Sequence, residues 1–148
     1  MSGLRLVEHH GDDGIQRAAD DVLAKLRAVL PRDLCALLDE SGLFAGPPAR
    51  RPVESVDAAT IRKTIRASRK ARIAYQTGEG RASKRTIWPI ALSFMERLRM
   101  VIAWCELRND FRCFRVDRIQ EWTELSEPIS RSRMALLGEW RKRENISE

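Results

Sequence analysis

The apolar positions in the first half of the chain recur at helical spacing. They predict an amphipathic helix over 15–30, which Pro31 ends, and a second helix that begins at the same proline. A third helix is predicted over 58–69, where Ser55 or Asp57 can cap the first turn. Beyond it the spacing becomes alternating, which is typical of strands.

The alternating part of the chain predicts five short strands. They are expected at 72–76, 84–90, 100–107, 111–116 and 119–125. Pro89 indicates that the second strand ends there or lies at an edge of the sheet, because proline donates no backbone hydrogen bond. A closing helix over 130–142 is expected to bury Met134, Leu137 and Trp140. Five short strands so close together favour a small, strongly bent antiparallel β-barrel.

The stretch 99–119 predicts a β-hairpin, and the other elements are organised around it. Its loop is predicted to hold the three residues 108–110, because Asn109 tolerates the left-handed conformation that such a loop needs. The register that follows pairs Glu106 with Arg112, Cys105 with Cys113, Trp104 with Phe114 and Ile102 with Val116. It gathers the large apolar side chains on one buried face. In this register Arg115 points to the opposite face, and no acidic partner is predicted for it.

The segment LFAGPPARRPV at 43–53 cannot hold a helix and indicates a linker. We therefore predict a helical lead segment at 1–45, a linker at 46–56 and a domain with flanking helices at 57–148. No run of the 148 residues approaches the roughly 18 apolar residues of a membrane-spanning helix. The first residues also lack the apolar core of a signal peptide, so a soluble, cytoplasmic protein without membrane contact is expected.

Charge is divided unevenly along the chain. Residues 1–50 hold six Lys and Arg against eight Asp and Glu, a net charge of −2, whereas residues 51–148 hold 21 against 13, a net charge of +8. A basic half of this kind suits nucleic acid or a small phosphorylated ligand. An ordinary arginine-rich surface explains the composition equally well.

Residues for catalysis or metal binding are few. The two histidines, His9 and His10, are adjacent in a predicted loop, so a catalytic arrangement or a metal site with Asp12 is less favoured than a solvated loop. We predict no enzyme, no catalytic residue, no metal and no cofactor. The odd number of cysteines indicates small buried hydrophobes, and a redox switch between Cys105 and Cys113 is the alternative.

Aromatic and arginine side chains are interleaved on the predicted strands and at strand ends, as base stacking and phosphate contact require. They are Tyr75, Arg85, Trp88, Trp104, Arg112, Arg115 and Arg118. Each has an ordinary alternative: Trp104 can belong to the core, Trp88 can pack on a helix, and Arg112 can pair with Glu106. Arg115 is the best single candidate for a ligand contact.

The order of these elements resembles that of the WYL-domain transcriptional regulators, in particular the YafY-like, DeoR-type branch. The resemblance is carried by IRKTIRASRKARIAY at 61–75, RTIWPIAL at 85–92, AWCELRNDFRCFRVDRI at 103–119 and LLGEW at 136–140. The tripeptide that names the domain would fall at 99–101, where this chain has Arg-Met-Val. Members of the family begin with a helix-turn-helix, and we expect this chain to start after it.

The resemblance implies an α+β fold with leading helices, a five-stranded Sm-like antiparallel β-barrel and a C-terminal helix. It implies a ligand-sensing domain of a bacterial regulator, which binds single-stranded nucleic acid or a nucleotide. The pocket residues it implies are Tyr75, Arg85, Arg112, Arg115 and Arg118. The alternative is a structural protein without a DNA-binding head, which forms a homodimer or dimerises with full-length regulators through 15–38 and the C-terminal helix.

Overall fold

The computed structural model describes residues 13–31, 33–35, 52–95 and 98–146. Backbone contacts divide the chain into two compact units, 1–50 and 51–148. The domain limits predicted from the sequence, 1–45, 46–56 and 57–148, stay a prediction.

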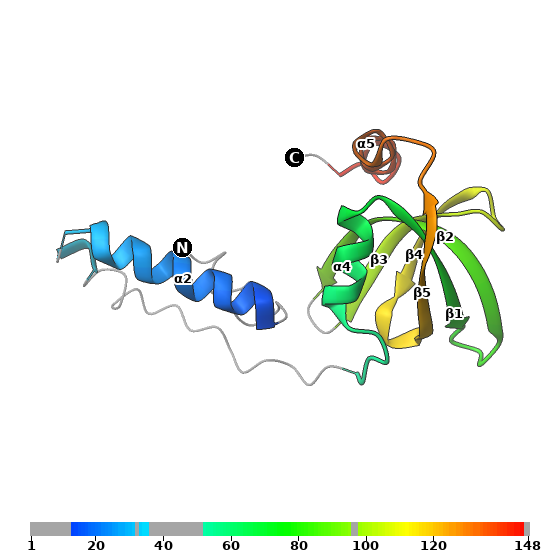
Figure 1. Cartoon of the computed structure of the whole chain (residues 1–148), viewed down its shortest axis with the longest axis horizontal. Helices are drawn as coiled ribbons and strands as arrows, with labels where there is room; N and C mark the ends of the chain where they lie inside the picture. Colours follow the sequence, from blue (N-terminus) through cyan, green and yellow to red (C-terminus); the bar gives the residue numbers. More distant parts are fainter. Residues whose placement is uncertain (1–12, 32, 36–51, 96–97, 147–148) are drawn as a thin grey trace. The chain divides into compact units, whose positions relative to one another are not determined.

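The first unit contains helix α2 (Asp13–Val29), which confirms the first predicted helix (Figure 1). The predicted second helix is described only at 33–35, and the rest of it lies outside the described residues. None of the described helices is long and apolar enough to cross a membrane.

The second unit is a five-stranded antiparallel sheet with two helices. Its elements are α4 (Ala58–Arg66), β1 (Arg69–Gln76), β2 (Ala82–Met95), β3 (Leu98–Cys105), β4 (Asp110–Arg115), the 3₁₀ turn η1 (Val116–Arg118), β5 (Ile119–Pro128) and α5 (Arg133–Arg143). The strand order is β4-β3-β2-β1-β5. The sheet is strongly curved but open, so the closed barrel expected from the sequence is wrong. The chain leaves β4 at Arg115 into η1, and β4 and β5 therefore form no ladder.

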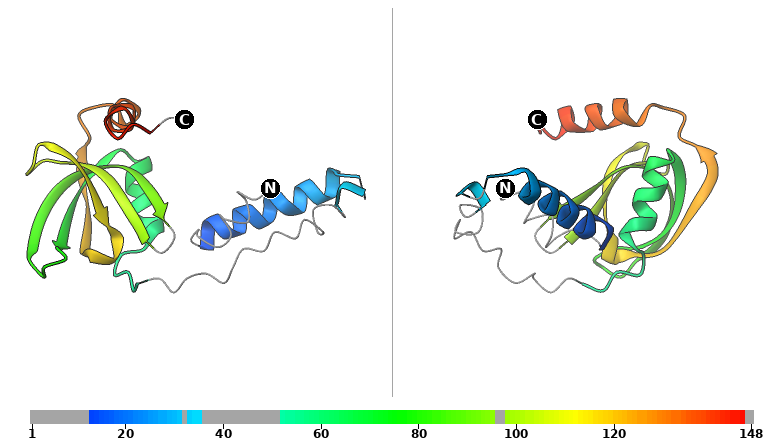
Figure 2. Two further views of the ribbon diagram at one scale, coloured as in Figure 1. Left: turned by 180° about the vertical axis from the view of Figure 1, so that it is seen from behind. Right: turned by 60° about the vertical axis from the view of Figure 1, so that its left-hand side comes forward.

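Helix α4 packs against the concave, inner face of this sheet (Figures 1 and 2). The side chain of Asp57 accepts a hydrogen bond from the backbone N–H of Ala59, which identifies the helix cap. Ile61 and Ile65 of α4 share a buried cluster with Ile73, on β1, and with apolar residues of the other strands. This packing covers one part of the inner face. The end of that face beside the β1–β2 and β3–β4 turns is left open.

Strand β2 continues through Pro89, against the expectation that it would end there or lie at an edge. It is the central strand of the sheet, and Pro89 is fully buried in it. The register with β3 shifts between Pro89 and Ala91, so the proline lies beside a β-bulge. A bulge removes one ladder position, which is how a central strand accommodates proline.

The register predicted for the central hairpin is wrong. The turn comprises 106–109, and the observed pairs are Ala103 with Arg112, Trp104 with Phe111, Cys105 with Asp110, Ile102 with Cys113, Val101 with Phe114 and Met100 with Arg115. Asn109 does adopt the predicted left-handed conformation, with φ of 48°. Trp104 and Phe114 point to opposite faces, and Cys105 does not face Cys113, so the geometry gives no support to a redox pair.

Helix α5 packs on the outer face of the sheet. Leu136 is fully buried there with Ile90, Ile102 and Ile129, and Leu137 and Trp140 pack against this cluster. The guanidinium of Arg133 donates a hydrogen bond to the carbonyl of Ile90 at 3.1 Å. Met134, which was predicted to be buried, is 61% exposed.

Candidate ligand-binding site

A pocket of about 390 Å³ lies on the inner face, at the end of the sheet with the β1–β2 and β3–β4 turns. It is lined by Tyr75, Thr77, Arg85, Cys105, Arg108, Arg112, Cys113 and Phe114. We call it the arginine pocket. Three of the five residues predicted for the site, Tyr75, Arg85 and Arg112, come together in it because alternate positions of a strand point to the same face.

The three arginines of the pocket have little compensating negative charge. Arg85 donates from Nε to the hydroxyl of Ser83 at 3.1 Å. Arg112 lies 3.9 Å from a carboxylate oxygen of Asp110, and its side chain is 55% exposed. Arg108 forms no ion pair with any residue that the structure describes, and no lining residue is acidic. The pocket therefore suits an anion, because one guanidinium can donate two parallel hydrogen bonds to two oxygens of a phosphate or carboxylate.

The apolar wall of the pocket joins two strands that are not neighbours in the sheet. The ring of Tyr75, on β1, lies edge to face against Phe114, on β4, with 5.1 Å between the ring centroids. The curvature of the sheet makes this contact possible, since β3 and β2 lie between the two strands. An aromatic surface next to guanidiniums can stack a base while the phosphate is bound.

Arg115 and Arg118, also predicted as site residues, do not line this pocket. Arg115 forms two hydrogen bonds to the carboxylate of Asp117, at 3.0 and 2.8 Å, so the expectation that it has no acidic partner is wrong. The contact lowers the pKa of Asp117 and raises that of Arg115. The guanidinium of Arg118 lies against Gly78, where an added Cβ would be 3.3 Å from its nitrogens.

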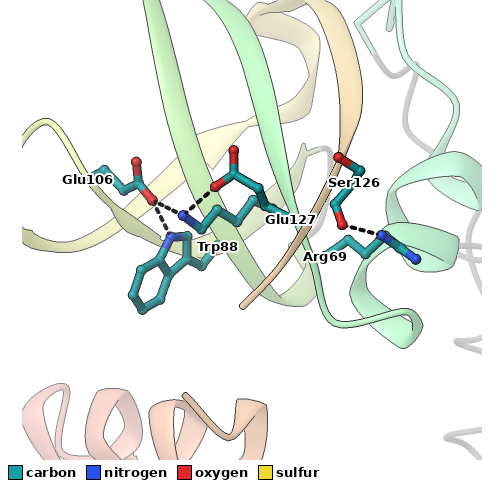
Figure 3. Close-up of polar contacts among 6 residues, drawn as sticks. Arg69, Trp88, Glu106, Ser126 and Glu127 are labelled. Atoms are coloured by element: carbon teal, nitrogen blue, oxygen red, sulfur yellow. Dashed lines mark hydrogen bonds and ion pairs between the residues drawn. The ribbon is translucent and has the colours of Figure 1, made fainter. Parts of the chain in front are cut away.

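Trp88 and Glu106 belong to a polar network outside the pocket (Figure 3). Glu106 accepts a hydrogen bond from the indole N–H of Trp88 at 2.7 Å and pairs with Lys70 at 2.9 Å. The ammonium of Lys70 also contacts Glu127 at 2.9 Å and lies 5.6 Å from the centroid of the Trp88 ring. Glu106 therefore contacts Lys70 and Trp88, and the alternative in which it pairs with Arg112 is wrong. The network holds the start of the 106–109 turn, which carries Arg108 into the pocket.

The Glu106 carboxylate should make the stability of the second unit depend on acid pH. Its hydrogen bond from Lys70, and then that from Trp88, lower its pKa below the ordinary value. A lowered pKa contributes stability above the unfolded value of about 4.3, and this stability is lost as the pH falls through the folded pKa. We expect Glu106→Gln to flatten the profile of unfolding free energy against pH below about pH 5. Urea titrations at several pH values measure this, and an unchanged slope would exclude the effect.

The sequence did not single out Arg108, because it was expected only in a polar loop. Its place in the turn gives no periodic signal, and the turn begins at Glu106, two residues earlier than predicted. His9, His10 and Asp12, the less favoured alternative for a metal site, lie outside the described residues. In the described part of the chain, no group of three His, Cys, Asp or Glu side chains could hold a metal ion.

A comparison with protein families gives one assignment. The family model of the WYL domain matches residues 57–124. This segment is a WYL domain. It begins at the Asp57 cap of α4, contains all of β1–β4 and η1, and ends within β5. All eight lining residues of the arginine pocket therefore belong to the WYL domain.

Among solved structures, the chain is similar to "Proteasome accessory factor B/C (PafBC) of Arthrobacter aurescens". The sequences are 24% identical, with a TM-score of 0.49 over 62% of this chain. The present chain spans 15% of the length of that protein. A search of the curated proteins gave no match.

Proposed function

We propose that the chain is a ligand-sensing WYL domain of a bacterial transcriptional regulator of the YafY-like type, and that it binds single-stranded nucleic acid or a nucleotide. The observation that supports this proposal is the arginine pocket, in which three guanidiniums and Tyr75 meet without an acidic lining residue. Arginines would bind phosphate oxygens, and Tyr75 would stack on a base. This is a binding site and not a catalytic one.

The proposed mechanism is a shift between two conformational populations. A ligand that binds one arrangement of the WYL domain more tightly would favour it, and a DNA-binding head attached to that domain would respond. The ligand can shift the equilibrium only by its difference in affinity for the two states. The resemblance to regulators with a helix-turn-helix supports this part of the proposal.

Binding of a fluorescently labelled thymidine tetranucleotide, followed by anisotropy over a salt series, tests the proposal. Three phosphate contacts should give a slope of log K against log salt of about −2, since each contact to a single strand contributes about −0.7. We expect Arg85→Ala or Arg112→Ala to weaken binding about five- to tenfold, because each removes a charge-assisted contact. A wild-type chain that binds neither this probe nor a nucleotide at low salt would contradict the proposal.

Arg72 provides a matched control for these variants. It is exposed on β1, next to the buried inner-face residues Ala71 and Ile73, and therefore points to the other face. Arg72→Ala removes the same charge as Arg112→Ala, and we expect a change in affinity below about twofold. Equal losses in the two variants would mean that net charge, and not the pocket, binds the probe.

Arg115 and Arg118 are kept as proposed contacts for a ligand longer than the pocket. Arg115 would have to share its guanidinium between Asp117 and the ligand, so its contribution should be smaller than that of Arg112. Arg115→Ala, measured with the tetranucleotide and with a longer strand, tests this. A loss of affinity restricted to the longer strand is the expected result.

A homodimer is the second candidate, in which the chain would act through its helices. Val22 and Val29 of α2 are 43% and 83% exposed, which favours a partner for this helix. Light scattering of the purified chain tests it, and a monomer at micromolar concentration would contradict it.

A further inference from the structure

Asp110, the first residue of β4, lies between two arginines of different elements. Its carboxylate accepts hydrogen bonds from both terminal nitrogens of Arg143, on α5, and the second of these is 3.2 Å long. The oxygen that accepts this second hydrogen bond, Oδ2 of Asp110, lies 3.9 Å from Nη2 of Arg112, which lines the arginine pocket. One carboxylate thus faces both the C-terminal helix and the pocket.

We propose that Arg143 is a positioning residue for the arginine pocket: by holding the carboxylate of Asp110, it keeps Arg112 available to an anionic ligand. The inference rests on the proposed function, since it assigns a regulatory contact to the same pocket. It concerns a helix outside the matched segment 57–124, which is why the pocket residues alone do not reveal it.

The geometry favours Arg143 over Arg112 as the partner of Asp110. The contact to Arg143 is a pair of hydrogen bonds, whereas 3.9 Å exceeds hydrogen-bonding distance. The hydrogen bond from Arg143 is also the main reason why the pKa of Asp110 is lowered. If Arg143 is removed, Arg112 becomes the nearest guanidinium to the carboxylate. Asp110 then neutralises one of the three cations of the pocket and repels an incoming phosphate.

The contact also couples the pocket to the docking of α5. A ligand that binds Arg112 leaves Arg143 as the remaining arginine partner of Asp110, so it should strengthen the contact between α5 and β4. Coupling between two binding equilibria is reciprocal, and a docked α5 should therefore raise affinity in the pocket. Leu136 and Arg133 fix the start and middle of α5 to the outer face, so loss of Arg143 is expected to loosen only its last turn.

The closing experiment compares affinities for the labelled thymidine tetranucleotide in about 50 mM salt, where exposed charges are weakly screened. We expect Arg143→Ala to weaken binding about three- to fivefold, as for the loss of an exposed but bidentate ion pair. Lys142→Ala removes an equal charge from the same helix and should change affinity less than about twofold. Asp110→Asn should bind at least as tightly as the wild type. In the Asp110→Asn background, Arg143→Ala should have no further effect.

That last comparison separates positioning from direct contact. If Arg143 itself touched the probe, its loss would weaken binding in the Asp110→Asn background as well, and this result would overturn the inference. Equal effects of Arg143→Ala and Lys142→Ala would also overturn it. A second readout, the rate at which phenylglyoxal modifies Arg112, needs no ligand and is measured by peptide mass spectrometry. The rate should fall in Arg143→Ala and rise in Asp110→Asn.

The two readouts distinguish the failure of the inference from the failure of the proposed function. A wild-type chain that binds no probe, but shows the expected changes in Arg112 reactivity, would contradict the function and support the exchange of partners at Asp110. A chain that binds the probe through Arg112, with unchanged reactivity in both variants, would support the function and overturn the inference.

Discussion

Leu136→Ala should destabilise the second unit by about 2–4 kcal/mol, which is the usual cost of truncating a fully buried leucine. Leu136 is 0% exposed in the outer-face cluster, so its truncation would leave a cavity lined by apolar side chains. The measurement is urea unfolding followed by tryptophan fluorescence. All four tryptophans lie in 51–148, so the signal reports this unit alone.

Met134→Ala is the matched control on the same helix. Its side chain is 61% exposed, so we expect a change below about 0.5 kcal/mol. The sequence pattern had favoured burial of Met134, and the structure buries Leu136. Equal costs for the two variants would mean that the helix packs with another face than the one described.

The strands were predictable from alternation, but their register was not. Alternation fixes which residues share a face only when one face is wet, and here α4 covers the inner face and α5 the outer one. Trp104 and Phe114 are both apolar for this reason, although they point in opposite directions. Pairing them on one face shifted the predicted register of the hairpin by three positions and placed the end of β3 two residues too late, inside the observed turn.

The candidate site was predictable as far as it depends on strands. Tyr75, Arg85 and Arg112 reach the pocket through the two-residue period of β1, β2 and β4. Arg108 enters from a turn, whose backbone path depends on the loop length, and periodicity carries no information about it. The contact between Arg115 and Asp117 depends on the 3₁₀ turn that follows β4, and the alternation of the sequence did not predict this turn.

Arg99→Met should destabilise the second unit by about 2–4 kcal/mol, because it removes one partner of a largely buried ion pair. Nη1 of Arg99 lies 3.1 Å from Oε2 of Glu54, and the two side chains are only 11% and 14% exposed. The guanidinium also lies 5.6 Å from the centroid of the Phe94 ring. Methionine keeps an unbranched apolar stem, so the loss should report the charge more than the packing.

A double-mutant cycle with Glu54→Gln identifies the origin of this loss. If the cost of Arg99→Met comes from a carboxylate left without its arginine in a poorly solvated place, Glu54→Gln should recover at least about 1 kcal/mol of it, since no charge is then buried. Additive effects would mean that Arg99 acts through packing on Phe94 instead. Arg99 stands where the resemblance places the first residue of the family tripeptide. A coupled pair would therefore mean that this chain uses charge at that position to tie the segment before α4 to the start of β3.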